Sequence, residues 1–263
     1  MNVIEAMKER RSVRTYDGRG LTENQRKAML QAIAESNSPF GGHLTIRMKK
    51  FNLKDGYKPT TYGMIKGAGD FFLLGYGNDD ASMLTAGYQF EQVVLKAWEN
   101  GLGTCWIAAT FKGTDFETGE MWPEGEELKI VSPVGVAAKK SMMEKIARFT
   151  VGSQKRKPMD ELFFFEDFKH AIPEDNRFRE ALEMMRLAPS STNSQPWRAL
   201  VAGNKVHFYA APKSKLCILD TGIGICHFHE TEKYKGTNGE FMHVADAPGG
   251  QEGWQYVTTY VAE

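Results

Sequence analysis

Hydroxyl and amide side chains are concentrated in residues 189–197, which have the sequence PSSTNSQPW. The segment lies between a predicted helix end and a predicted strand, and loops held by rigid elements often carry binding residues. Side chains of these types can hold a polar ligand in a fixed geometry through directed hydrogen bonds. A polar turn after a helix is the simpler interpretation, but it explains the serines and the asparagine rather than the whole string. On the residues alone, both interpretations stay open.

Two clusters of basic residues have side chains suited to an anion. The first is RRSVR at residues 10–14, which follows a predicted helix with Val3, Ile4 and Met7 at helical spacing. The second is KRK at residues 155–157. Guanidinium groups bind phosphate with paired donors and do not lose their charge. The alternative for both clusters is an ordinary solvated basic face.

The segment GLGTCW at residues 101–106 contains two glycines, which allow close approach of the backbone to another group. The alternative is a helix C-cap, which Gly101 can form in either case. The segment lacks the six-residue GxGxxG spacing of a dinucleotide-binding fold, and this excludes a Rossmann interpretation. Cys105 has no identifiable base partner, so packing is favoured over a nucleophilic role.

Residue types that bind metals occur together at Cys226, His227, His229 and Glu230, with His243 nearby. On a helix, however, His227 and His229 would point about 200° apart. The chain also lacks the CxxC and HExxH spacings of zinc sites. We therefore predict no metal site.

Helices and strands that alternate along the chain must position these segments. Thr22 and Gln25 form a capping-box pattern, which predicts a helix to about residue 35. Asp80 can cap a long helix that stops at Asn100 and Gly101. Further helices are predicted at 176–187 and from Asp220, and strands at 44–51, 71–76, 130–138, 198–202, 206–211 and 256–261.

The order helix, polar loop, strand, strand, helix, strand occurs twice. Residues 36–42 (SNSPFGG) take the place in the first part that residues 189–197 take in the second, and a Pro-aromatic pair occurs in both. We predict an α+β fold of two related α/β halves, residues 1–165 and 166–263, that form a pseudo-dimer in one chain. Trp197 is expected to pack in the core.

The composition is that of an ordinary globular protein. Of 263 residues, 41% are hydrophobic and 25% are charged, which is enough for a full core without disulfides or metals. The 33 basic residues equal the 33 acidic ones, so neither a nucleic-acid nor a membrane partner is indicated. The N-terminus lacks the apolar core of a signal peptide, and no apolar run approaches a membrane span. With three scattered cysteines, we predict a soluble cytoplasmic protein.

Five segments together resemble the nitroreductase family. APSSTNSQPW at residues 188–197 is similar to the family's APSSxNSQPW signature, and RRSVRTY at residues 10–16 to its RRSxRxF/Y pattern. GLGTCW at 101–106, VGVA at 134–137 and KRKPMDEL at 155–162 follow in the family's order. Each segment alone is a weak signal, but five of the right type span most of the chain. The resemblance implies a nitroreductase-like fold.

The resemblance also implies an FMN site to which both halves contribute. Arg10 and Arg156 suit the phosphate, and Ser12 adds a hydrogen bond. Arg14 approaches the N1/O2 edge of the ring, where a fixed cation favours the reduced, anionic flavin. Backbone amides of residues 101–104 face the N5/O4 edge. The implied cofactor-binding residues are Arg10, Arg11, Ser12, Arg14, Gly101, Leu102, Gly103, Thr104, Lys155, Arg156, Pro189, Ser190, Ser191, Asn193 and Gln195.

One departure from the family pattern changes the expected number of sites. In the family, the signature loop follows soon after RRSxR, and the flavin lies between two identical subunits. Here the degenerate residues 36–42 follow RRSVRTY, and the intact loop comes about 175 residues later. The second half has no RRSxR counterpart before its own helix. We therefore predict one FMN per chain and a monomer whose halves imitate the dimer.

The predicted function is an oxidoreductase whose partner is a small-molecule electron acceptor. NADH or NADPH delivers hydride to N5 of FMN, and a nitroaromatic or quinone-like acceptor then takes the electrons in a ping-pong cycle. No side chain is expected to be catalytic, because the chemistry occurs on the flavin. Two alternatives remain: a flavin storage or sensor protein without efficient turnover, and another chemistry of this fold, dehalogenation or flavin fragmentation.

Overall fold

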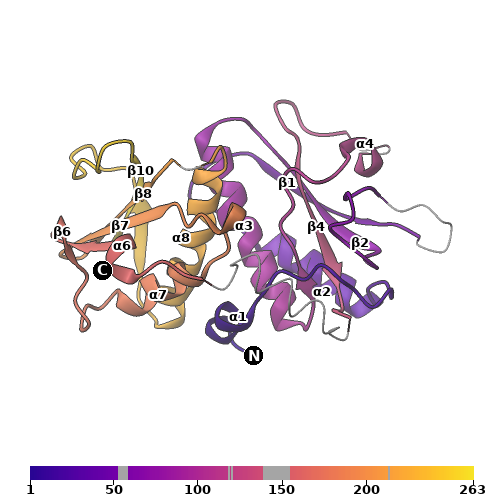
Figure 1. Cartoon of the computed structure of the whole chain (residues 1–263), viewed down its shortest axis with the longest axis horizontal. Helices are drawn as coiled ribbons and strands as arrows, with labels where there is room; N and C mark the ends of the chain where they lie inside the picture. Colours follow the sequence, from indigo (N-terminus) through magenta and orange to yellow (C-terminus); the bar gives the residue numbers. More distant parts are fainter. Residues whose placement is uncertain (53–58, 118, 120, 139–154, 213) are drawn as a thin grey trace.

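The structure, a computed structural model, describes residues 1–52, 59–117, 119, 121–138, 155–212 and 214–263. Two β-sheets lie on opposite sides of the molecule, and two long helices, α3 (Asp80–Glu99) and α8 (Cys217–Tyr234), pack together between them (Figure 1). Each sheet is built from one part of the sequence. The predicted α+β fold of two halves that form a pseudo-dimer is therefore confirmed.

The four-stranded sheet belongs to the first half and has the strand order β1-β2-β4-β3, antiparallel throughout. All of its β2 residues are buried, because alternate side chains enter two different hydrophobic clusters. Phe72 and Leu74 join the main core, whereas Phe71 and Leu73 join a smaller cluster on the other face. The elements are α1 (Val3–Glu9), α2 (Glu23–Glu35), β1 (Leu44–Lys50), β2 (Asp70–Tyr76), β3 (Gly103–Thr104), α4 (Gly113–Phe116) and β4 (Glu127–Gly135).

The six-stranded sheet has the order β6-β5-β7-β8-β10-β9, in which only the β5–β7 pair is parallel. Strands β5, β6 and β9 escape prediction from the sequence because they are too short to show an alternating pattern. Strand β5 pairs with β7 and therefore belongs to the second sheet, although it precedes the predicted boundary after residue 165. The division of the chain at residue 165 stays a prediction. The elements are α6 (Met159–Leu162), β5 (Phe163–Phe165), β6 (Asp167–Ala171), α7 (Arg179–Leu187), β7 (Trp197–Ala202), β8 (Lys205–Ala210), β9 (Gly239–Met242) and β10 (Gln255–Ala262).

The two halves share one topology. Apart from the short helix α4 between β3 and β4, the first half runs α2-β1-β2-α3-β3-β4, and the second runs α7-β7-β8-α8-β9-β10. The strand order β1-β2-β4-β3 of the first sheet recurs as β7-β8-β10-β9 in the second, and each of these neighbours is antiparallel to the next. The elements of this shared unit therefore have counterparts at the same places in the two halves, whereas α1, α4, α6, β5 and β6 lie outside it.

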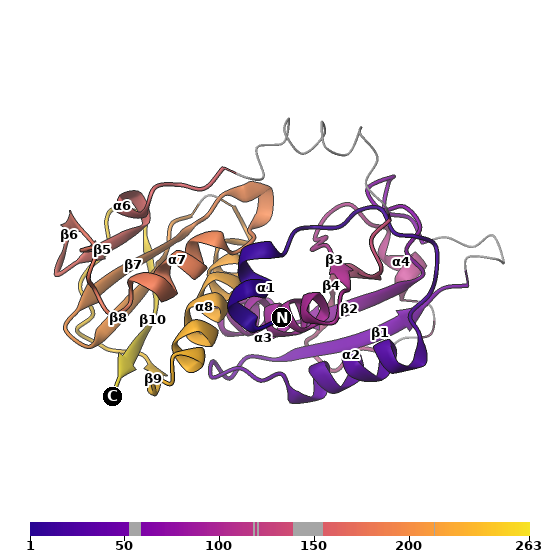
Figure 2. The same ribbon diagram turned by 90° about the horizontal axis from the view of Figure 1, so that it is seen from below.

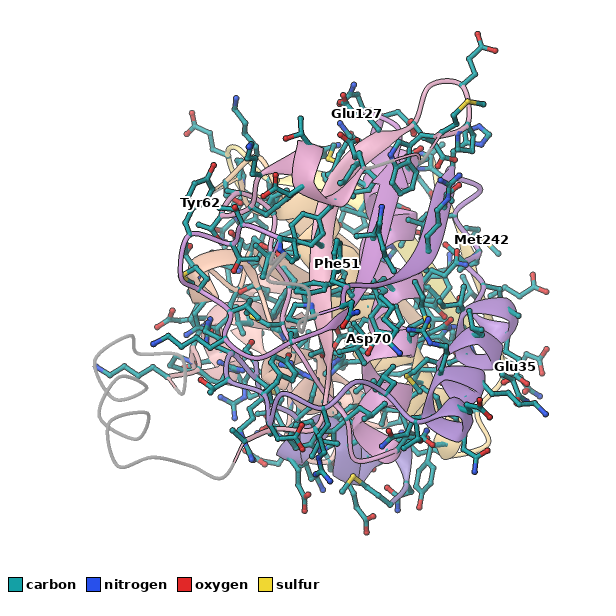
Figure 3. The ribbon with its side chains drawn as sticks, turned by 90° about the vertical axis from the view of Figure 1, so that its right-hand side faces the viewer. Glu35, Phe51, Tyr62, Asp70, Glu127 and Met242 are labelled. Carbon is teal, nitrogen blue, oxygen red and sulfur yellow. The ribbon has the colours of Figure 1, made fainter. Side chains whose placement is uncertain are left out.

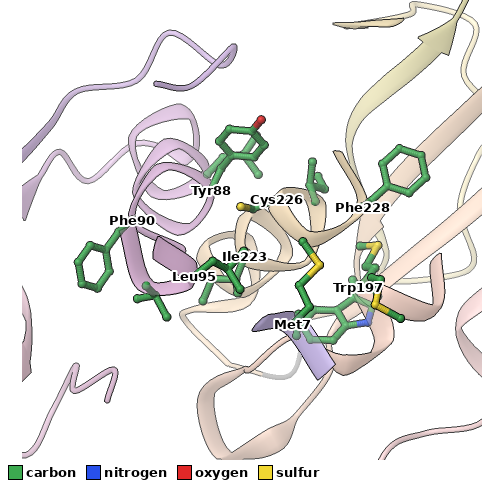
Figure 4. Packing of buried hydrophobic residues seen from close by; sticks show 14 of the residues in the cluster. Met7, Tyr88, Phe90, Leu95, Trp197, Ile223, Cys226 and Phe228 are labelled. Atoms are coloured by element: carbon green, nitrogen blue, oxygen red, sulfur yellow. The ribbon is translucent and has the colours of Figure 1, made fainter. Parts of the chain in front are cut away.

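The central helices cross so closely that two positions require glycine. A Cβ atom on Gly87 of α3 would lie 2.0 Å from the carbonyl oxygen of Leu219, and one on Gly222 of α8 would lie 2.4 Å from that of Leu84. These contacts are reciprocal, as at an interface with twofold symmetry. Side chains of both helices meet in one core, which also contains Trp197 (Figure 4). Trp197 is 0% exposed, which confirms its predicted packing role.

The helix starts differ in detail from those expected. Asp79 caps α3, since its Oδ1 accepts the N–H of Ser82 at 2.8 Å, and the prediction of Asp80 as the cap was wrong. Helix α8 begins at Cys217, so Asp220 lies within its first turn instead of opening the helix. The carboxylate of Asp220 is therefore available to another segment of the chain.

A buried ion pair attaches helix α2 to the first sheet. Asp70, at the start of β2, is 1% exposed, accepts the N–H of Leu21 at 2.9 Å and pairs with the guanidinium of Arg26. Figure 3 shows Asp70 beside the strands and helix α2, which ends at Glu35. This contact holds in place the chain that follows the first basic cluster.

Candidate functional site

Residues 10–14 leave α1 in an extended conformation and run beside strand β3. Helix α1 lies where the two halves meet, in contact with α3, α7 and α8 (Figure 2). It ends at Glu9, and the next residue, Arg10, has a φ of −56° and a ψ of 136°, outside the helical region. Ser12 then forms a parallel bridge with Thr104, and the N–H of Val13 donates to the Thr104 carbonyl at 2.8 Å. Backbone pairing thus joins two of the predicted site segments.

The two glycines of residues 101–104 have separate structural roles. Gly101, at φ 72°, ends α3: its N–H and that of Leu102 donate to carbonyls in the last turn, each at 2.9 Å. A Cβ atom on Gly103 would lie 2.4 Å from Cγ2 of Val13. The close approach expected at Gly103 is therefore made by the chain's own N-terminal segment, and the C-cap interpretation of Gly101 is confirmed.

The loop at residues 189–197 has a constrained backbone. Thr192, Asn193 and Gln195 have φ values of 51°, 56° and 48°, in the left-handed region that residues with a Cβ seldom adopt. Strain of this kind is concentrated at functional sites. Oγ of Ser190 accepts the N–H of Gln195 at 2.9 Å and closes the loop on itself. The loop therefore presents its polar groups in a fixed arrangement.

A buried carboxylate in the first turn of α8 anchors this loop. Both oxygens of Asp220 accept the N–H of Ser191, at 3.0 and 3.1 Å, and Oδ2 accepts the hydroxyl of Ser194 at 3.5 Å. Burial raises the pKa of Asp220 to about 7, although the hydrogen bonds from Ser191 and Ser194 oppose the rise. The loop thus depends on a carboxylate that is costly to ionise.

The raised pKa of Asp220 predicts a pH-dependent stability. Between about pH 4 and about pH 7 the folded state keeps a proton that the unfolded state has lost, so stability falls as the pH rises through this window. The fall from this group amounts to at most about 4 kcal/mol. Asp220→Asn should remove it, and urea unfolding of both proteins across the window measures the difference. Unfolding free energies that vary in parallel with pH would contradict the raised pKa.

The second basic cluster is attached to the same loop. Nη1 of Arg156 donates to Oδ1 of Asn193 at 2.9 Å, and Nδ2 of Asn193 donates to the carbonyl of Lys155 at 2.7 Å. The N–H of Lys157 donates to Oε1 of Gln195 at 2.8 Å. The structure thus brings together residues 155–157 and the loop, as the resemblance implies.

Arg10, whose side chain is buried, and the half-buried Arg156 together form a cationic cluster. The pKa of Arg156 is lowered to about 10 by burial and by the nearby positive charges of Arg10 and Arg186. The side chain of Arg10 is only 5% exposed, and its Nε and Nη1 have no hydrogen-bond partner within the described residues. Buried donors and like charges in this arrangement are costly unless an anion satisfies them. The cluster is therefore suited to a phosphate.

Other predicted site residues have additional contacts. The guanidinium of Arg11 lies 5.2 Å from the ring centre of Trp98, a cation–π contact. Burial raises the pKa of the Cys105 thiol, although the positive charge of Arg14 and a hydrogen bond to Ser12 oppose the rise. A neutral, buried thiol agrees with the predicted packing role for Cys105. Leu102 is 1% exposed, so only its backbone can face a ligand.

Four residues near the cluster and the loop are not singled out as binding residues by the sequence. Asp220 holds the loop, and Arg186 adds charge beside Arg156. Glu91 and His227, on the two central helices, lie behind Arg10. The available signal for Glu91 is a carboxylate among the apolar positions of a long helix. Asp220 has no such signal, because its main partner is a backbone N–H distant in sequence.

A hollow of about 360 Å³ occupies the counterpart place in the fold. Here the first half supplies the loop, which is the degenerate one, and the second half supplies strands β9 and β10. At the candidate site the loop comes from the second half instead. Phe40, Phe241 and Tyr256 contribute to its wall, and no arginine or lysine is among its described lining residues. Thr85, whose Oγ1 accepts the N–H of Gly42 at 3.1 Å, anchors the degenerate loop. This counterpart hollow therefore lacks the charge needed to hold a phosphate.

The histidines of the discounted metal cluster have separate partners. His227 contacts Glu91, whereas Nδ1 of His229 lies 2.6 Å from the hydroxyl of Tyr88. Within the described residues, no group of three or more His, Cys, Asp or Glu side chains is placed to hold a metal ion. None of the helices in the described ranges has the length and hydropathy needed to cross a membrane.

Comparison with solved structures shows that the fold is that of the nitroreductases. A structure described as a nitroreductase from Thermotoga maritima MSB8 matches 99% of this chain and 94% of its own, with a TM-score of 0.63 and 18% identity. An FMN-dependent nitroreductase from Clostridium difficile R20291 matches 52% of this chain and 89% of its own (TM-score 0.44, 17% identity). A nitroreductase with bound FMN from Bacteroides fragilis NCTC 9343 matches 54% and 91% (TM-score 0.43, 19% identity). No curated protein sequence gives a significant match.

The family can be stated more closely. The profile of the family described as "Putative TM nitroreductase" matches residues 2–231 of the 263. The chain therefore belongs to this nitroreductase family, and the resemblance inferred from five sequence segments is confirmed.

Proposed function

We propose that this protein is an FMN-dependent oxidoreductase that takes electrons from NADH or NADPH and passes them to a nitroaromatic or quinone-like acceptor in a ping-pong cycle. The observation that carries the proposal is the cationic cluster of Arg10 and Arg156, in which Arg10 is buried, beside the constrained loop at 189–195. Membership in a nitroreductase family supports the reaction class. When bound, FMN accepts hydride at N5 and releases electrons to the acceptor.

The cationic cluster fits the phosphate end of FMN. A phosphate monoester carries nearly two negative charges at neutral pH, and two guanidinium groups balance them. Nε and Nη1 of Arg10 are buried donors that such a group would satisfy. Ser12 follows on the same extended segment and supplies a hydroxyl, and Lys155 adds charge from the segment that precedes α6. The chain's own role at this end is to bind and orient.

The polar part of the site fits the ribityl chain and the ring. Pro189, Ser190, Ser191, Asn193 and Gln195 lie on the loop whose backbone the hydrogen bonds to Asp220 and Ser190 hold. A fixed cation at Arg14, on the other half, would favour the reduced anionic ring and so raise its potential. Backbone amides of residues 101–104 would face the N5/O4 edge. In this proposal, both halves contribute to one site.

We propose one FMN per chain and a monomer. The counterpart hollow combines the degenerate loop with β9 and β10, and no arginine or lysine is among its described lining residues. The shared topology and the reciprocal Gly87 and Gly222 contacts support an origin of the halves by internal duplication, divided near residue 165. Three free cysteines, two of them buried, agree with a reducing cytoplasm.

Purified protein is expected to be yellow and to release about one FMN per chain on heating. Anaerobic NADH or NADPH should bleach the flavin, and a nitroaromatic or quinone should restore its colour. Absorbance of the released flavin, measured against protein concentration, gives the stoichiometry. Bleaching by neither nucleotide would favour the storage or sensor alternative, and bleached flavin that these acceptors fail to reoxidise would favour another flavin chemistry. Protein that cannot be reconstituted with FMN would refute the proposal.

A further inference from the structure

A fully buried carboxylate lies behind the cationic cluster and connects three parts of the chain. Oε2 of Glu91, on α3, accepts the indole N–H of Trp106 at 2.9 Å. Oε1 lies 3.0 Å from Nε2 of His227, on α8, and 3.6 Å from Nε of Arg10. Glu91 and His227 are both 0% exposed, so water does not screen these charges as it would at the surface.

The contacts of His227 determine where its protons lie. Nδ1 is 3.0 Å from the carbonyl oxygen of Met184, which can only accept, so Nδ1 carries a proton. Without a second proton, the lone pair of Nε2 would face an oxygen of Glu91 across 3.0 Å. A proton is therefore shared between the two side chains. The pair is neutral as a whole, either as imidazolium and carboxylate or as two uncharged groups.

The neutrality of the pair determines how strongly Arg10 attracts an anionic ligand. An unpaired carboxylate at Glu91 would balance the guanidinium of Arg10 and weaken its attraction for an anion. Because His227 shares its proton with Glu91, the positive charge of Arg10 is left uncompensated beside Arg156.

We propose that His227 is a positioning residue for the phosphate site: it cancels the charge of Glu91, so that the positive charge of Arg10 remains available to the phosphate. His227 thus acts through Glu91 and Arg10. The pair joins the two central helices at this site, since Glu91 lies on α3 of the first half and His227 on α8 of the second. The inference rests on the proposed function for the identity of the anion, the phosphate of FMN.

The test is the phosphate preference, defined as the dissociation constant of riboflavin divided by that of FMN. His227→Gln keeps a donor toward Glu91 but carries no charge, so the preference should fall about tenfold. Glu91→Gln removes the negative charge, keeps polar atoms for Trp106 and His227, and should not lower the preference. The double variant Glu91→Gln/His227→Gln is neutral again and should recover the wild-type preference. A purely structural role would instead make the double variant the weakest.

Controls separate this inference from folding and from the proposed function. Glu99→Gln removes a half-buried carboxylate that pairs with Lys96 on the same helix and should not change the preference, and circular dichroism checks the fold of every variant. Binding of inorganic phosphate, measured by calorimetry, should follow the same order and tests the pair even if neither flavin binds. Wild type that binds neither flavin would refute the proposed function. An unchanged preference in His227→Gln, or a double variant as weak as His227→Gln, would overturn the inference.

Discussion

Arg10→Ala is expected to weaken FMN binding by roughly 100-fold, because two buried, charged donors to the phosphate are lost together. Riboflavin, which has no phosphate, should bind the variant and the wild type almost equally. Fluorescence titration with both flavins measures the two affinities. The prediction follows from the burial of this guanidinium, since an exposed arginine exchanges ligand for water at little cost.

Arg19→Ala is the matched control for this experiment. Arg19 belongs to the same N-terminal segment, its side chain is 78% exposed, and it pairs at the surface with Asp17 at 2.6 Å. Its removal should leave the affinity for FMN unchanged. If Arg10→Ala retained FMN as well as Arg19→Ala does, the phosphate would not lie at the cationic cluster.

Gly222→Ala is expected to destabilise the fold by about 2–4 kcal/mol, although alanine is the better helix former. The added methyl group would lie 2.4 Å from the backbone carbonyl oxygen of Leu84 on α3. Backbone atoms in the middle of a helix cannot move aside separately, so the two helices must part. Urea unfolding, with the free energy extrapolated to water, measures the loss.

Gly224→Ala, on the same helix, is the matched control. Both substitutions gain about 1 kcal/mol of helix propensity, so their difference reports the contacts alone. At Gly224 the nearest atoms belong to the side chains of Met185 and Trp197, at 3.1 Å, and the methionine can shift. Its stability should stay within about 1 kcal/mol of wild type. Equal stability of the two variants would contradict the close crossing of α3 and α8.

Much of the candidate site could be predicted from local sequence. The loop at 189–197 and the basic residues 10–14 and 155–157 are contiguous strings whose chemistry is visible in the residues themselves. Helical periodicity and capping patterns likewise predict α2, since the Thr22 capping box forms as expected. Short strands such as β9 could not be predicted, because four residues are too few to show a period of two.

Residues whose partners are distant in the sequence could not be predicted from local sequence patterns. Glu91 and His227 are 136 positions apart, and Asp220 reaches Ser191 across 29. Neither contact leaves a local pattern, since a carboxylate on a helix has the same appearance in the sequence whether it faces water or a histidine. Likewise, Gly103 allows close packing in any fold, and only the structure shows that Val13 fills the space.

The basic segments, the polar loop and the order of elements are properties of the sequence, because hydrogen-bonding side chains and periodicity are local. From them follow the nitroreductase fold and a single intact signature loop. Only the tertiary structure decided that Arg10 lies buried beside Arg156 and next to the Glu91–His227 pair. The physical reason is that burial and charge compensation depend on the crossing of α3 and α8, which brings together residues from both halves of the chain.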